Sequence, residues 1–279
     1  MSGTVASFCL MAIAARELSG VISVFEILFF RSVIGLLVIS FIIVFLGKAQ
    51  LVTTGRISHH AIRNVFHFGG QFGWVLGIGV LPLAEVFALE FTVPVWVTII
   101  AAVFLNERLT RNKLLSVSLG LLGVVVIVQP GIEIFDSAAF IVLGAAICYA
   151  ITHTITKSLT NTEAPVTILF YMCAFQLPIG LILSYSDWHY PAGIQWLWLT
   201  LIGLTALTGH YCLSRAMQLS DVGKVMTLDF FRLPVIALLG VILYAEGFDM
   251  TIILGGALIL SGNLFNFYAS SSLKEQTQK

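Results

Sequence analysis

Residues 79–131 read GVLPLAEVFALEFTVPVWVTIIAAVFLNERLTRNKLLSVSLGLLGVVVIVQPG and contain two long apolar runs separated by a short charged segment. An α-helix needs about 20 mainly apolar residues to cross a bilayer, and each run comes close to that length. The charged segment, 106–113, has the turn and charge signals of a connection between two helices. The stretch therefore predicts successive membrane-spanning helices at 84–105 and 112–129.

The rest of the chain has the same apolar character. Of its 279 residues, 58% are hydrophobic and 10% are charged, whereas soluble domains carry about 25% charged residues. A soluble fold could not cover its surface with so few charges, so the composition requires a lipid bilayer as solvent. The formal net charge is zero, which gives no electrostatic reason to expect nucleic acid as a partner.

Scanning outward for similar apolar runs predicts ten helices in all. Turn residues and charges separate them, and no loop is long enough to form a further domain. The predicted helices are 2–18, 24–46, 60–80, 84–105, 112–129, 137–158, 164–184, 196–216, 222–244 and 250–269. The polar segment 270–279 is expected to be a disordered cytoplasmic tail.

Lysines and arginines are divided unevenly between the two predicted sides of the membrane. With the N-terminus in the cytoplasm, nearly all of them fall on the cytoplasmic side, Arg63 and Lys113 included, and the opposite side keeps only Arg16. Basic residues favour cytoplasmic loops. Both termini are therefore predicted to be cytoplasmic.

The second half of the sequence repeats features of the first at an offset of 139 residues. This offset places Glu90 on Asp229, Glu107 on Glu246, Gly123 on Gly262 and Gln71 on His210. Each half is predicted to hold five helices, an odd number, so the second copy crosses the membrane in the opposite sense. Inverted repeats are typical of transporters that bind substrate near the bilayer midplane. We therefore predict an all-α membrane protein of two inverted repeats, 1–133 and 134–269, around a central cavity.

Three segments carry a resemblance to a known family. Residues 23–35 (SVFEILFFRSVIG), 79–131 and 228–263 (LDFFRLPVIALLGVILYAEGFDMTIILGGALILSGN) resemble the EamA family of the drug/metabolite transporter superfamily. The most specific marks are Glu107 and Glu246, each followed by a glycine-rich helix. The resemblance covers essentially the whole chain and implies ten helices around a cavity, working by alternating access. Residues 23–35 and 228–263 are similar to members that import S-adenosylmethionine, while other members export amino acids or carry other metabolites.

Ionisable groups at membrane depth are candidates for substrate contact, because each costs about 2.5 kcal/mol or more to insert. Glu90 and Asp229 occupy matching places in the two repeats and are expected to face one cavity, where such a carboxylate could also carry a proton. Asp229 and Arg232 lie three apart on one helix face and could instead simply pair. The ionisable candidates are Glu26, Arg31, Glu90, His153, His210, Asp229 and Arg232.

The predicted helix 60–80 divides polar and small residues between two faces. Asn64, His67, Gln71 and Trp74 recur at spacings of three and four, which stacks them on one face that we predict to line the cavity. The glycines on the other face allow a neighbouring helix to approach closely. Tyr149 and Tyr211 add aromatic rings near His153 and His210.

These candidates together favour a zwitterionic substrate. Aromatic rings beside carboxylates suit a cation, whereas Arg31 and Arg232 suit a carboxylate or a phosphate. Glu107 and Glu246 are expected to be structural, each accepting from the N-terminal amides of the helix that follows.

The sequence holds no HExxH, GxSxG or phosphate-loop motif, and its four scattered cysteines have no metal-ligand spacing. No cofactor, metal site or enzymatic activity is predicted. The predicted function is secondary transport of a small polar metabolite, amino-acid-like or nucleoside-like, across the bacterial inner membrane. An exporter of the same family, a channel and an intramembrane enzyme are the alternatives. Cargo, direction, coupling ion and oligomeric state stay open.

Overall fold

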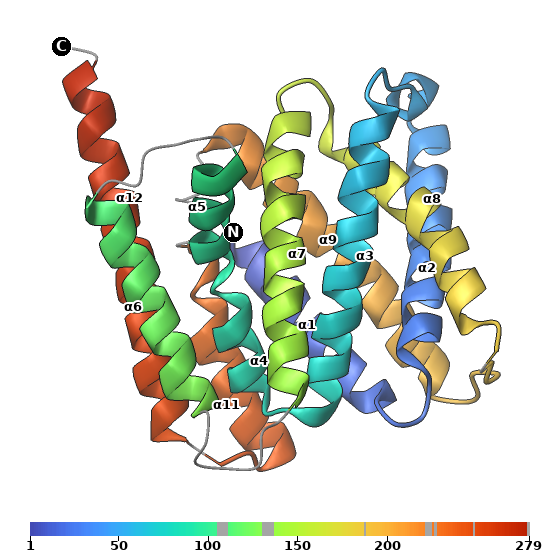
Figure 1. Cartoon of the computed structure of the whole chain (residues 1–279). Coiled ribbons are helices and arrows are strands. Elements are labelled where there is room, and N and C mark those ends of the chain that lie inside the picture. The colour runs from blue at the N-terminus through green and yellow to red at the C-terminus, as the bar shows by residue number, and fades with distance from the viewer. Residues whose placement is uncertain are drawn as a thin grey trace.

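The computed structural model describes residues 1–104, 111–129, 137–186, 188–220, 225, 228–247 and 249–277. Over these residues the chain is helical, with a short 3-10 turn, η1 (Ala49–Val52), and without β-strands. Figure 1 shows long helices standing side by side in one bundle. The predicted all-α fold class is therefore confirmed.

The helices of the first half are α1 (Ser2–Leu18), α2 (Val24–Phe45), α3 (Ile57–Val80), α4 (Leu83–Glu90), α5 (Val93–Phe104) and α6 (Arg111–Val128). Those of the second half are α7 (Ser137–Leu159), α8 (Pro165–Ser184), α9 (Gln195–Leu219), α11 (Arg232–Tyr244) and α12 (Met250–Thr277). The prediction of a disordered tail from residue 270 was wrong, since α12 runs on to Thr277 through good helix formers such as Leu273, Lys274 and Glu275.

One predicted membrane helix, 84–105, is interrupted in its middle. Helix α4 ends at Glu90, turn residues 91–92 follow, and α5 begins at Val93. Pro94 explains the break, because a proline ring clashes with the carbonyl four residues earlier, here that of Glu90. In the first turn of α5 the proline is tolerated, since amides there have no helical partner.

The second half contains the same break 139 residues later. Asp229 is the last helical residue before turn residues 230–231, and α11 begins at Arg232. Pro234 lies in the first turn of α11 and excludes a regular helical bond to residue 230. Broken membrane helices are typical of transporters, in which they form the substrate site. The sequence alone predicted one continuous helix at each of these two places, 84–105 and 222–244.

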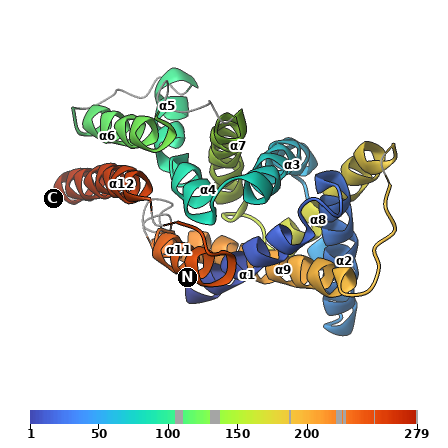
Figure 2. The same ribbon diagram turned by 90° about the horizontal axis from the view of Figure 1, so that it is seen from below.

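The helices pack in pairs that join the two halves of the chain. Helix α3 packs along α7, α1 along α9, α2 along α8, and α6 along α12. Seen from below, α6 and α12 lie at one end of the bundle and α2 and α8 at the other, with α4 and α11 between them (Figure 2). The broken helices are therefore central.

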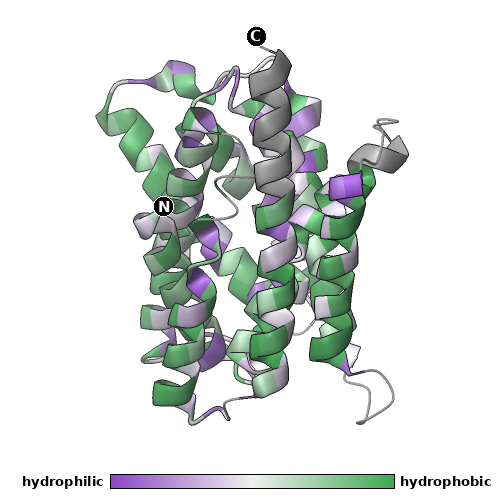
Figure 3. Cartoon of the chain, turned by 90° about the vertical axis from the view of Figure 1, so that its left-hand side faces the viewer, coloured by the Kyte–Doolittle hydropathy of each residue, from purple (hydrophilic) through white to green (hydrophobic). Residues whose placement is uncertain are grey.

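The outer faces of the bundle are apolar. Side chains of α2 such as Leu37, Phe41 and Phe45 are 67%, 69% and 78% exposed, and hydrophobic residues make up most of the coloured helices in Figure 3. Six described segments are long and apolar enough to cross a membrane: Val24–Phe45, Leu83–Ile100, Arg111–Val128, Ser137–Leu159, Pro165–Ser184 and Gln195–Leu219. The chain is a multi-pass membrane protein, whose lipid-facing surface needs no charges.

Candidate substrate cavity

Three charged side chains meet where the two membrane helices break. Nη2 of Arg232 donates to Oε1 of Glu90 at 2.9 Å and to Oδ2 of Asp229 at 2.5 Å. All three side chains are largely buried. The carboxylates predicted to face each other thus share one guanidinium, and we call Glu90, Asp229 and Arg232 the charged triad. Its formal charge is −1.

Aromatic rings hold the triad in place. The guanidinium of Arg232 lies 4.8 Å from the ring centre of Phe8, 5.2 Å from that of Phe87 and 5.1 Å from that of Phe91. Such cation–π contacts stabilise a desolvated guanidinium. Nε1 of Trp74 donates to Oε2 of Glu90 at 2.9 Å. The position of Glu90 is therefore fixed from two sides.

Two atoms of the triad have no hydrogen-bond partner among the residues that the structure describes. They are Oδ1 of Asp229 and Nε of Arg232, both buried. Buried polar atoms in proteins are nearly always bonded. The triad thus offers an acceptor and a donor that a bound molecule can satisfy, which simple pairing of Asp229 with Arg232 does not explain.

A small cavity adjoins the triad. Its lining residues are Phe8, Met11, Gln71, Trp74, Glu90, Tyr149, His153, His210, Leu213, Asp229 and Arg232. Its volume is about 20 Å³, enough for about one water molecule. A metabolite can enter this cavity only if the helices around it move apart.

Eight of the twelve predicted site residues line this cavity: Gln71, Trp74, Glu90, Tyr149, His153, His210, Asp229 and Arg232. The rings of Tyr149 and His153 stack with their centres 6.1 Å apart. Five of the eight were predicted as ionisable groups at membrane depth, and Gln71 and Trp74 from their helical spacing. The structure brings them together from α3, α4, α7, α9, α11 and the segment that ends at Asp229.

Arg31 and His67 lie behind the wall of the cavity. Arg31 donates from Nη1 to the amide oxygen of Gln71 and from Nη2 to that of Gln176. Nδ1 of His67 lies 2.6 Å from Nε2 of Gln176. Gln71 thus connects Arg31 to the cavity, and Gln176 connects His67 to Arg31.

The structure places Glu26 and Tyr211 away from this cavity. Glu26 forms a capping box with Ser23 at the start of α2 and accepts from the backbone amide of His189 at 2.8 Å. Its carboxylate is used at a helix end rather than at mid-membrane. Tyr211 is 44% exposed, because one residue turns a helix by about 100° away from the face of His210.

Glu246 joins the two halves of the chain. Its Oε1 accepts from Nη2 of Arg16 at 2.5 Å and its Oε2 from the backbone amide of Leu83 at 2.9 Å. It therefore caps the N-terminus of α4, whereas the sequence predicted that it would cap the helix that follows it. Glu107, for which the same role was predicted, lies outside the described residues.

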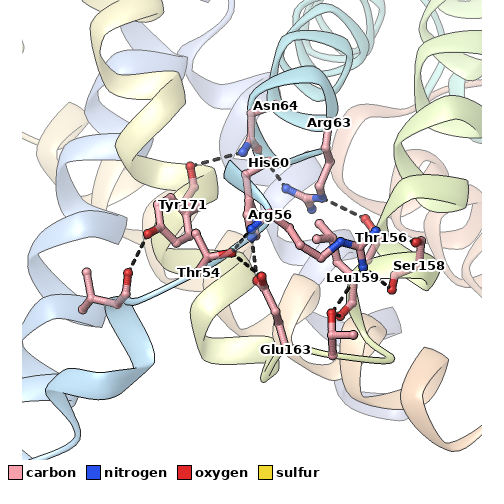
Figure 4. A network of polar contacts seen from close by, with 12 residues as sticks. Thr54, Arg56, His60, Arg63, Asn64, Thr156, Ser158, Leu159, Glu163 and Tyr171 are labelled. Atoms are coloured by element: carbon pink, nitrogen blue, oxygen red, sulfur yellow. Dashed lines mark hydrogen bonds and ion pairs between the residues drawn. The ribbon is translucent and has the colours of Figure 1, made fainter. Parts of the chain in front are cut away.

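A polar network ties α3 to α7 and to the loop after α7 (Figure 4). His60 Nε2 lies 2.6 Å from Oε2 of Glu163, Arg56 donates to the backbone oxygen of Ser158 at 2.8 Å, and Arg63 donates to Thr156 at 2.8 Å. Arg63 was counted among the basic residues of the cytoplasmic side, at the start of the predicted helix 60–80. The structure buries it in α3, which begins at Ile57 instead of residue 60.

Gln176 and Phe8 are contact residues that the sequence search missed. That search considered ionisable groups at membrane depth and polar side chains that recur on one helix face, so Gln176, isolated in an apolar run of α8, escaped it. Phe8 lies in an apolar helix where nothing marks an inward-facing ring. A search for any polar side chain in a membrane helix would have found Gln176.

A multi-pass helical protein with a buried charged site at two matching helix breaks belongs to the class of membrane transporters. More particularly, the chain belongs to the EamA-like transporter family, which its sequence matches over residues 1–129 and 136–268. It is a transporter and not an enzyme.

Relatives of several kinds are similar to this chain. An S-adenosylmethionine uptake transporter of Rickettsia felis is 25% identical over 257 residues, 91% of this chain and 87% of that protein. A riboflavin transporter of Rhizobium johnstonii is 31% identical, covering 74% and 68%. A pseudopaline exporter, CntI, of Pseudomonas aeruginosa is 27% identical, covering 91% and 89%. A solved crystal structure with a TM-score of 0.70, covering 97% and 96%, is 17% identical and shows the fold alone.

Proposed function

We propose that this protein is a secondary transporter that moves a small, positively charged metabolite across a bacterial inner membrane by alternating access. The cargo is amino-acid-like or nucleoside-like, and S-adenosylmethionine is the first candidate. The observation that carries the proposal is the charged triad at the two helix breaks, with a buried oxygen of Asp229 left unpaired.

Two arguments favour S-adenosylmethionine. The triad has a formal charge of −1, and this metabolite combines a sulfonium and an ammonium cation with one carboxylate. Desolvated cations bind best where opposite charge is already in place. The relatives named as S-adenosylmethionine uptake transporters also match over nearly the whole chain. On the same evidence we propose that the predicted site residues lining the cavity bind the substrate.

We further propose the arrangement of ten membrane-spanning helices as two inverted repeats, 1–133 and 134–269. Support comes from contacts that recur in both halves. Arg16 donates to the backbone oxygen of Leu81 at 2.7 Å, and Lys157 donates to that of Ser220 at 3.0 Å. Residues 81 and 220 are 139 positions apart, as are the two breaks. The family matches each half separately.

In the orientation that we propose, both termini face the cytoplasm and the polar network of α3 and α7 lies on the cytoplasmic side. The distribution of lysine and arginine supports this. The cluster of Arg16, Leu83 and Glu246 then lies on the opposite side. Substrate movement requires the contacts on one side to open while those on the other stay closed.

Export of a metabolite, or transport of riboflavin, is the second candidate function, favoured by the relatives with those names. Riboflavin is uncharged and would leave the negative triad uncompensated, so we place it behind a cationic cargo. Few charges of mixed sign at the site also argue against a channel, which needs repeated pore residues.

The test is uptake of radiolabelled metabolites into proteoliposomes that contain the purified protein. The panel comprises S-adenosylmethionine, riboflavin and methionine, each with and without an imposed proton gradient. We expect saturable exchange of S-adenosylmethionine. Uptake of riboflavin in place of S-adenosylmethionine would overturn the proposed cargo. Accumulation of the substrate inside the vesicles, against its own concentration gradient, gives the direction of transport.

A further inference from the structure

Two arginines in the interior have no acidic partner in the part of the chain that the structure describes. Arg31 and Arg63 are each 2% exposed. Arg31 donates to the side-chain oxygens of Gln71 and Gln176, and Arg63 to those of Thr156 and Asn64. A buried charge paired only with neutral groups costs several kcal/mol. This side of the interior therefore carries positive charge without compensation.

The two arginines belong to one hydrogen-bonded chain. Asn64 accepts from Arg63 at 2.8 Å and from Nε2 of Gln176 at 3.5 Å, and Gln176 accepts from Arg31. Arg31 in turn bonds Gln71, which lines the transport cavity. The positive charge is thus connected to the cavity wall by contacts on α2, α3 and α8.

Hydrogen-bond donors outnumber acceptors around Gln71. Nδ1 of His67 accepts from Gln176 at 2.6 Å, so the proton of the neutral ring lies on Nε2. That Nε2 lies 3.5 Å from Nε2 of Gln71, which is itself a donor. Neither amide can be turned over, because both amide oxygens accept from Arg31. An N–H group of His67 is therefore left facing another donor.

This donor-rich layer reaches the cavity through two of its lining residues. Gln71 and His210 both line the cavity, and Nε2 of Gln71 lies 3.5 Å from Nε2 of His210. The ring of His67 contacts that of His210, with their centres 4.8 Å apart. A molecule in the cavity can thus meet the triad on one side and the donor layer on the other.

We propose that Arg31, His67 and Gln71 form an anion subsite, which binds the carboxylate of the substrate while the charged triad binds its cationic group. The proposal rests on the proposed function, since it takes the cavity as the transport site. A carboxylate would replace the neutral amide oxygen of Gln71 on Arg31, and charge-assisted bonds of this kind are about twice as strong. The substrate then lies across the bundle, from α2 and α3 toward α4 and α11 (Figure 2).

The test compares S-adenosylmethionine with its decarboxylated form, which keeps both cations and lacks the carboxylate. Binding is measured by thermal unfolding of the full-length protein in detergent, with sodium acetate at constant ionic strength as a third probe. The wild type should bind S-adenosylmethionine about tenfold more tightly than the decarboxylated form, the difference that one charge-assisted hydrogen bond makes. Acetate alone should raise its Tm.

Substitutions at Arg31 test whether this residue causes the difference in binding and the response to acetate. Arg31→Gln should bind both compounds equally and lose the response to acetate. Arg31→Lys keeps the charge without the guanidinium fork and should be intermediate. Arg215→Gln is the matched control, since Arg215 is partly exposed on α9 and bonds Gln218, and it should behave as the wild type.

The outcomes separate this subsite from the proposed cargo. Equal binding of both compounds by the wild type, with no effect of acetate, would overturn the subsite while supporting a cationic cargo. A response to acetate that depends on Arg31, without binding of S-adenosylmethionine, would support the subsite and overturn that cargo. If Arg31→Gln does not fold, Arg31→Lys and the acetate response of the wild type still decide the question.

Discussion

Arg232 has no counterpart in the other half of the chain, although its two partners do. The residue 139 positions before it is Val93, whereas Glu90 and Asp229 are counterparts of each other. The two carboxylates therefore occupy equivalent positions in the two repeats, whereas the arginine occurs in the second repeat and not in the first. This asymmetry leaves the net negative charge that we take to recognise a cationic substrate.

The carboxylates are expected to couple transport to protons. In Glu90→Gln or Asp229→Asn, Arg232 keeps one charged partner, so the fold should persist. We predict that at least one variant loses gradient-driven accumulation and keeps exchange, which needs no net proton movement. Asp249→Asn, an exposed carboxylate near α12, is the control. Full accumulation by both variants would show that neither carboxylate couples protons.

Trp74 is predicted to hold Glu90 in place as well as to line the cavity. Trp74→Phe keeps a buried ring and removes the indole N–H that donates to Glu90. A hydrogen bond to a charged group contributes about 2 kcal/mol, so the Tm should fall. Trp196→Phe, at a ring that is 47% exposed, should change the Tm little. An equal shift in both variants would contradict this role.

The sequence could predict which side chains of one helix share a face, because helical periodicity alone determines this. Gln71 and Trp74 share a face of α3, and both line the cavity. It could not predict what Glu26 does, because a capping box depends on the exact start of α2. It could not predict the unpaired oxygen of Asp229 either, since that follows from how side chains distant in the sequence pack around the triad.

At the scale of elements, the main difference from the prediction is that two helices predicted to be continuous are each broken, at matching positions of the two repeats. Hydropathy follows side chains and not backbone bonds, so 84–105 and 222–244 each read as one apolar run. The prolines are one position out of register, with Pro94 second in α5 and Pro234 third in α11, whereas both breaks are in register. The two repeats therefore match more exactly in the position of the break than in the position of the proline.

The pair α6 and α12 depends on glycines at its crossing. A Cβ atom on Gly123 would lie 2.6 Å from the backbone oxygen of Gly255, and backbone cannot move aside as a side chain can. Gly123→Ala should therefore lower the free energy of unfolding by about 1–3 kcal/mol. Gly144→Ala in α7, where a Cβ meets nothing within 4 Å, should be neutral or stabilising. Similar Tm values for the two variants would contradict this account of the crossing.

At the scale of the whole molecule, orientation is a prediction from charge alone. We expect Lys113→Cys to react with a membrane-impermeant maleimide only from the cytoplasmic side. Tyr190→Cys, at a side chain that is 88% exposed in the loop before α9, should react only from the outside. Labelling of residue 113 from outside the cell would overturn the proposed topology.

At the same scale, the proposed transport requires that substrate pass through the cavity beside the charged triad. Leu213 lines this cavity and is 4% exposed, whereas Leu204 on the same helix is 41% exposed on the outer face. Leu213→Trp fills the cavity, and Leu204→Trp adds the same ring toward lipid. The two variants therefore differ only in where the added volume lies.

The most direct measurement is counterflow of radiolabelled S-adenosylmethionine in proteoliposomes that hold equal amounts of the wild type and of each variant, with elution on size exclusion confirming that all three are folded. We predict counterflow by the wild type and by Leu204→Trp, and its loss in Leu213→Trp. Counterflow by Leu213→Trp at the rate of the wild type would contradict transport through this cavity.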